Sequence, residues 1–222
     1  MREITCTLIA DGSSDIVLLP ILRWLFHQHS DHPARFEWAD LRTRVEPPST
    51  LDQRIVVALM LRPCEVLFIH RDAERESYGA RKQEIERAVE SARRQTSLPN
   101  WIGVIPVRMQ EAWLLWDETA IRQAVGNPNG KTRLDLPAIN RLERIEDPKA
   151  QLHDLLRQAS ERSPRRLKDF NPAKQAHRIV EMIDDFAPLR QLAAFERLEH
   201  DLAALLQTLT DAHPQTETEH GN

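Results

Sequence analysis

Acidic side chains follow short apolar runs in this sequence, a placement that predicts a site for a divalent metal ion. Asp72 and Glu74 are two residues apart after "VLFIH", Asp11 follows "TLIA", and Glu111 follows "VIPVRMQ". Carboxylates gathered in one place repel one another unless a cation neutralises them, and oxygen ligands favour a hard ion such as Mg²⁺ or Mn²⁺. Asp11, Asp72 and Glu74 are therefore candidate metal ligands, and all four acids are candidate catalytic residues.

The elements that must position these acids are read from the apolar periodicity. Over the first 117 residues, strand-like and helix-like patterns alternate, which predicts a mostly parallel sheet covered by helices on both faces and joined by right-handed crossovers. Loops at the carboxyl ends of parallel strands line the ligand crevice, so the acids should converge there. The fold class is thus α/β, with four strands predicted at residues 4–10, 35–42, 65–70 and 101–108 and helices at 13–28, 50–62 and 74–96.

Strand patterns stop after residue 117, and the remainder reads as helical segments followed by a polar stretch. We expect an α/β domain over 1–118, a helical extension packed on it over 119–209, and a disordered tail over 210–222.

The chain carries 30 basic and 34 acidic side chains, so a surface for nucleic acid would have to be a local patch. Only two cysteines are present and no apolar run reaches the length of a membrane span, which favours a cytoplasmic protein without membrane association.

Three motifs carry a resemblance to a known fold. "LIADGSSD", "FIHRDAE" and "VRMQEAWLLWD" resemble Toprim-like proteins, and within them a family of uncharacterised bacterial proteins with a Glu-Ala-Trp-Leu-Leu-x-Asp motif. That family is related to nuclease domains of the overcoming-lysogenization-defect type. The resemblance covers roughly residues 3–118 and implies a Toprim-like sheet that holds Mg²⁺ for phosphoryl transfer.

The metal ligands carry over position by position. In Toprim domains a glutamate after the first strand and an Asp-x-Asp pair after the third hold the ion. Asp11 takes the place of the glutamate, Asp72 that of the first aspartate, and Glu74 that of the second. Asp11 is one methylene shorter than the usual glutamate and Glu74 one longer than the usual aspartate, so Asp15 or Glu111 is a candidate for a missing ligand.

The resemblance implies a divalent-metal-dependent nuclease that acts on nucleic-acid phosphodiesters, with a role in defence against phage. One or two Mg²⁺ or Mn²⁺ ions would activate water and stabilise the leaving oxygen. Such a site needs basic residues for the phosphate backbone, and Arg71, Arg75 and Arg108 stand beside the acids in the sequence.

Two other functions stay open. A non-catalytic assembly module would keep the fold and dock onto a partner ATPase through the helical half, and self-association of the chain fits either function. A receiver-like domain would be phosphorylated on Asp72, but the sequence lacks the fifth strand and the following lysine that such a domain needs. His27, His29 and His32 suggest zinc, but their places near a helix end are better explained by the helix dipole.

Overall fold

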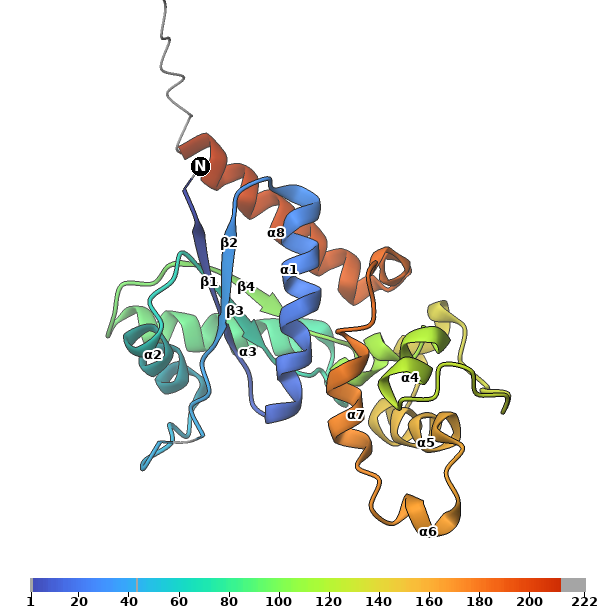
Figure 1. Cartoon of the computed structure of the whole chain (residues 1–222). Helices are drawn as coiled ribbons and strands as arrows, with labels where there is room; N and C mark the ends of the chain where they lie inside the picture. Colours follow the sequence, from blue (N-terminus) through green and yellow to red (C-terminus); the bar gives the residue numbers. More distant parts are fainter. Residues whose placement is uncertain (1, 43, 213–222) are drawn as a thin grey trace, which may run out of the picture.

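The computed structural model describes residues 2–42 and 44–212 and contains a four-stranded, all-parallel sheet (Figure 1). The strand order is β2-β1-β3-β4, with Cys6 opposite both Phe36 and Val66, and Val66 opposite Asn100. This arrangement confirms the predicted α/β class with a parallel sheet, flanking helices and a helical C-terminal segment. The strands are β1 (Ile4–Ile9), β2 (Ala34–Trp38), β3 (Val66–His70) and β4 (Asn100–Val104).

Helices cover both faces of the sheet, which explains why β3 is an unbroken apolar run with every residue buried. Val66 and Phe68 face a core shared with α1 and α8, whereas Leu67 and Ile69 face a second core built with α2 and α3. Figure 1 shows α1 and α8 lying near each other beside the sheet. The bounds of these helices are α1 (Leu18–His29), α2 (Leu51–Leu61), α3 (Tyr78–Arg93) and α8 (Ala193–Ala212).

The strand order places a topological switch point between β1 and β3. From β1 the chain crosses through α1 to β2 at one edge, and from β3 it crosses through α3 to β4 at the other. The loops that follow β1 and β3 therefore leave the sheet in opposite directions. A crevice opens between such diverging loops at the carboxyl ends of the strands, which is where ligands bind in open α/β sheets.

Several predicted element bounds are corrected by backbone conformation. The predicted strand 101–108 ends at Val104, because Pro106 has no N–H to donate and Arg108 has a φ of 65°. The predicted helix 74–96 begins only at Tyr78, after a loop in which Glu74 has a φ of 54°. Ser77 then caps the helix by accepting a hydrogen bond from the Ala80 N–H at 3.1 Å.

Two other predicted segments also differ from the structure. The predicted helix 13–28 starts as a 3₁₀ helix, Ser13–Val17 (η1), so Pro20 falls in the first turn of α1, where a missing N–H is tolerated. The predicted strand 35–42 is displaced to Ala34–Trp38.

After β4 the described chain is helical, and its apolar residues continue the core on the α1 side of the sheet. Trp113 meets Phe195 of α8 edge-on, with ring centroids 5.4 Å apart, so the "EAWLLW" segment packs between sheet and helix. The predicted tail over 210–222 is wrong at residues 210–212, because α8 continues to Ala212, and the rest of that prediction lies outside the described residues. The helical elements are η2 (Gln110–Leu114), α4 (Glu118–Ala124), η3 (Ile139–Arg144), α5 (Pro148–Ser160), α6 (Pro164–Leu167), α7 (Pro172–Ile179) and η4 (Ala187–Gln191), followed by α8. Over residues 2–42 and 44–212, no helix has the length and apolar character required to cross a bilayer.

An ion-pair cluster fastens α8 to its neighbours. Glu199 of α8 accepts hydrogen bonds from Arg190 Nε at 2.9 Å and Nη2 at 2.7 Å, and its Oε1 lies 2.8 Å from His29 Nε2 at the end of α1. The hydrogen bonds from Arg190 hold the pKa of Glu199 below its ordinary value of 4.5, and the contact with His29 adds to the shift. The cluster therefore stabilises the folded state only while Glu199 is ionised.

We predict a pH-dependent loss of stability in Glu199→Gln. Because the folded-state pKa is depressed, the contribution of the carboxylate is complete above the unfolded-state value and disappears as pH falls through the folded-state value. The variant should lose about 1 kcal/mol of unfolding free energy at pH 7, and the difference should vanish in acid. Urea denaturation across pH would measure it. Glu90→Gln, which removes an exposed partner of Arg93, is the control and should change little at either pH.

Candidate functional site

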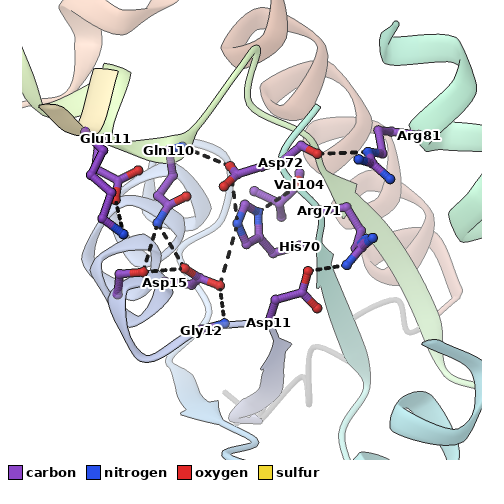
Figure 2. A network of polar contacts seen from close by, with 12 residues as sticks. Asp11, Gly12, Asp15, His70, Arg71, Asp72, Arg81, Val104, Gln110 and Glu111 are labelled. Carbon is purple, nitrogen blue, oxygen red and sulfur yellow. Dashed lines mark hydrogen bonds and ion pairs between the residues drawn. The ribbon is translucent and has the colours of Figure 1, made fainter. Parts of the chain in front are cut away.

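A pocket of about 300 Å³ opens at the carboxyl ends of β1 and β3, at the topological switch point. It brings Asp11, from the loop after β1, together with Asp72 and Glu74, from the loop after β3, which lie 61 and 63 positions further along the sequence. Figure 2 shows the side chains converging from the two loops, with Gln110 and Glu111 approaching from the segment after β4. The pocket is lined by Asp11, Gly12, Asp15, His70, Arg71, Asp72, Glu74 and Arg81.

Asp15 is buried and held by three hydrogen bonds. Its Oδ2 accepts from the Gly12 N–H at 2.8 Å, and its Oδ1 accepts from Ser14 Oγ at 2.9 Å and from Gln110 Nε2 at 2.9 Å. The bond to Gly12 closes the loop after β1 over the first turn of η1. Asp15 is thus a fixed acceptor at the floor of the pocket.

His70 is the last residue of β3 and is 2% exposed. Its Nδ1 lies 3.0 Å from the Val104 carbonyl oxygen, and because a carbonyl can only accept, Nδ1 carries the proton. Burial lowers the pKa of His70 against the opposing charge of Asp15, which favours the neutral ring. In that state Nε2 presents a lone pair, 3.5 Å from Asp72 Oδ1 and 3.9 Å from Asp15 Oδ2.

Asp72 is the most strongly perturbed acid of the pocket. Burial raises its pKa to about 8, and the negative charges of Glu111 and Asp15 add to the shift. Only the backbone N–H of Gln110, 2.9 Å from Oδ1, favours the ionised form among the hydrogen bonds at this carboxylate. Burial also raises the pKa of Glu111, whose Oε1 lies 3.6 Å from Lys149 Nζ.

Gln110 connects the two carboxylates. Its backbone N–H binds Asp72, its side-chain Nε2 binds Asp15, and its Oε1 is buried without a hydrogen-bond partner in the described part of the chain. The floor of the pocket therefore collects acceptors: two carboxylates, an imidazole lone pair and an amide oxygen. Such a set is stable only with an added proton or cation, so its chemistry fits a cation.

Two of the predicted metal ligands face arginines instead. The Asp11 side chain is 43% exposed and forms ion pairs with both Arg54 and Arg71. Glu74 is 61% exposed, and its Oε2 lies 3.6 Å from Arg81 Nη2. Throughout residues 2–42 and 44–212, no three His, Cys, Asp or Glu side chains form a ready-made metal site. Of the predicted ligands, Asp72 alone points into the buried floor.

The predicted substrate-binding arginines lie in two places. Arg71 lines the pocket and also reaches Glu84 Oε1 at 2.9 Å, so both ends of its guanidinium are paired. Arg75 and Arg108 line an adjoining hollow of about 620 Å³, which shares Glu74 and Arg81 with the pocket. Acids line this hollow as well, so it is a mixed-charge surface.

Sequence reasoning missed His70 and Gln110 as site residues. The segments "IHRD" and "QEAW" match no functional motif by themselves. The hydrogen bond between Gln110 and Asp15 joins residues 95 positions apart, so no local pattern indicates it. Asp15 was considered only as a substitute ligand. The available signal was indirect, because both missed residues end or follow a buried strand, as the predicted acids do.

Neither protein-family models nor curated proteins nor solved structures gave a match to this chain. The resemblance to Toprim-like proteins therefore rests on the sequence motifs alone.

We predict that Asp72→Asn stabilises the protein at neutral pH in the presence of a chelator. A folded-state pKa above the ordinary value of 3.8 means that stability falls as pH rises from about 4 to about 8. Asparagine removes the buried charge, and the gain should be on the order of 2 kcal/mol at pH 8 and near zero at pH 4. Guanidinium denaturation at both pH values would measure it.

The control for this prediction is Asp154→Asn, which alters an exposed aspartate of α5 that pairs with Arg157. It should leave the pH profile of stability unchanged. A destabilised Asp72→Asn at pH 8 would contradict the prediction and would mean that the ionised carboxylate is well compensated in the folded state.

Proposed function

We propose that this chain is a divalent-cation-dependent hydrolase of nucleic-acid phosphodiesters, built on a Toprim-like α/β domain. The observation that carries the proposal is the convergence of Asp15, Asp72 and Glu111 at the switch point of the sheet. Asp15 lies in η1, Asp72 in the loop after β3 and Glu111 in η2, and burial raises the pKa values of Asp72 and Glu111. A structural role alone would not require a protein to bury so many acids in one place.

Each group has a role in that chemistry. A bound divalent cation would polarise the phosphoryl oxygen and activate water. Burial raises the pKa of Asp72 to about 8, so a bound cation would stabilise its charged form and hold it as a ligand. Glu111, close to Lys149, is a second acid within the same cluster. The pKa of each acid would fall once a cation binds.

Arginines at the mouth supply charge for the phosphate. Arg71 and Arg81 line the pocket, and their present partners are Asp11, Glu84 and Glu74. An incoming phosphate would compete for these guanidinium groups, which bind phosphate in two-point contacts. Arg75 and Arg108 extend the basic side chains into the adjoining hollow, along which a strand of DNA or RNA would run. By resemblance, the organism would use such a nuclease as an effector against phage.

A second candidate function is a non-catalytic assembly module that binds a partner ATPase. One specific observation favours it: Asp11 and Glu74, at the positions of family metal ligands, are engaged by arginines. If these ion pairs persist, the pocket is a structural ion-pair network and the helical half supplies the docking surface. The cleavage experiment below separates the two functions.

We predict metal-dependent cleavage of at least one of plasmid DNA, single-stranded DNA and total RNA, with Mg²⁺ or Mn²⁺ present. Asp72→Ala and Glu111→Gln should each lower the rate by about 100-fold or more, because each removes a buried acid of the centre. Glu90→Gln, remote from the pocket, is the control. Absence of cleavage on all three polymers, together with an unchanged melting temperature when metal is added, would favour the assembly module.

We also predict that Arg75 contributes to strand binding through charge. Arg75→Ala should weaken binding of labelled single-stranded DNA and reduce the slope of log affinity against log salt by about 0.7. Fluorescence anisotropy at several salt concentrations, with chelator present to prevent cleavage, would measure both. Arg133→Ala removes an exposed arginine in the loop after α4 and should leave the slope unchanged. If the slope of log affinity against log salt were the same in Arg75→Ala and Arg133→Ala, Arg75 would not contact the nucleic acid.

A further inference from the structure

We propose that the cation of this site is held by His70 Nε2 and Gln110 Oε1 together with Asp15 and Asp72, and not by Asp11 and Glu74. The inference deepens the proposed function, since it rests on a cation acting at the same pocket. It assigns a mixed nitrogen–oxygen site in place of the all-carboxylate site that the sequence suggests.

The first argument is the fixed orientation of His70. The ring is locked by the hydrogen bond from Nδ1 to the Val104 carbonyl, and a backbone carbonyl is a typical partner for the second nitrogen of a metal-bound histidine. Nε2 therefore points at Asp15 and Asp72 with its lone pair. At 3.9 Å and 3.5 Å, these contacts are too long for hydrogen bonds.

The distances from His70 Nε2 to the Asp15 and Asp72 oxygens suit three ligands of one shared ion. With metal–ligand bonds of about 2.1 Å, adjacent ligands of an octahedral ion lie about 3.0 Å apart and opposite ones about 4.2 Å. Both distances at His70 fall between these limits. The Gln110 N–H holds Asp72, and His70 and Asp15 are held by their own hydrogen bonds, so the positions of all three side chains are set before an ion binds.

The second, independent argument is Gln110. Its side chain is buried and oriented by the hydrogen bond from Nε2 to Asp15, so its Oε1 has a defined direction but no hydrogen-bond partner among the described residues. A buried amide oxygen without a partner is costly, and a cation would satisfy it. Figure 2 shows Gln110 and His70 on either side of the gap between the Asp15 and Asp72 carboxylates.

The donor set predicts the metal. Imidazole nitrogen suits transition metals, whereas Mg²⁺ strongly prefers oxygen and keeps much of its water. Two carboxylates, one amide oxygen and one imidazole therefore favour Mn²⁺ over Mg²⁺. Asp11 and Glu74, which remain paired with Arg54, Arg71 and Arg81, need not change for Mn²⁺ to bind.

The test uses Mn²⁺ as an electron-paramagnetic-resonance probe of the full-length protein. Titration should show binding at one site, with an affinity about tenfold or more above that for competing Mg²⁺. Pulsed spectra should contain the coupling of a directly bound ¹⁴N nucleus, and labelling all histidines with ¹⁵N should convert it to the ¹⁵N pattern. The labelled wild-type protein needs no substitution, so this result does not depend on how variants fold.

Variants then locate the nitrogen and oxygen donors. His70→Gln should abolish the nitrogen coupling and weaken Mn²⁺ binding by about tenfold or more, and Gln110→Met should weaken binding with the coupling retained. His27→Gln, an exposed histidine of α1, is the matched control. Asp11→Asn and Glu74→Gln should keep the coupling and bind Mn²⁺ within about twofold of wild type, since neither side chain is a ligand.

Three results would overturn the inference: bound Mn²⁺ without nitrogen coupling, loss of binding in Asp11→Asn or Glu74→Gln, or no binding of Mn²⁺ at all. Its failure is separable from that of the proposed function. Metal-dependent cleavage without nitrogen coupling would keep the hydrolase and reject this ligand set. Nitrogen-coupled Mn²⁺ without cleavage of any polymer would keep the ligand set and reject the hydrolase.

Discussion

The hydrogen bond from His70 Nδ1 to the Val104 carbonyl is the contact on which the organisation of the pocket depends. It joins the ends of β3 and β4 across their shared edge, and it sets which nitrogen of the buried ring carries the proton. The other nitrogen then faces two carboxylates that the protein has withdrawn from water. Because the lone pair of His70 Nε2 faces the carboxylates of Asp15 and Asp72, the pocket is stable only with a positive charge present. This charge is either a proton on Asp72 or a bound cation.

The fold could be predicted from the sequence because its signals are local. The short apolar runs of β1 and β3 are signals that act within a few residues, so the strands and their order along the chain were correctly expected. The predicted end of β4 was wrong because the backbone leaves the extended conformation before Arg108, which has a positive φ. The site was predictable only in its location. The partners of Asp11 and the bridging role of Gln110 arise from contacts across the fold that no spacing in the sequence encodes.

Two residues with left-handed backbone conformation tie the loops around the pocket together. Glu74 and Arg108 both have positive φ, and the Glu74 N–H donates to the Arg108 carbonyl at 2.8 Å while Arg108 Nη1 donates to the Glu74 carbonyl at 3.2 Å. Non-glycine residues in this region cost of order 1 kcal/mol each, so the reciprocal bonds offset a local strain. The loops after β3 and β4 are therefore constrained to move as one unit, which keeps Asp72 and Gln110 in register.

The position of α8 has a consequence for how the chain folds as it is made. α8 packs against α1 and β4, and its Phe195 covers Trp113, but it is synthesised about 90 residues after β4 ends. At ordinary rates of translation that interval is roughly 5 to 20 s, long compared with the collapse of a domain of this size. The part of this core that α8 completes stays open throughout, so the packing of Trp113 against Phe195 forms only after α8 has been synthesised.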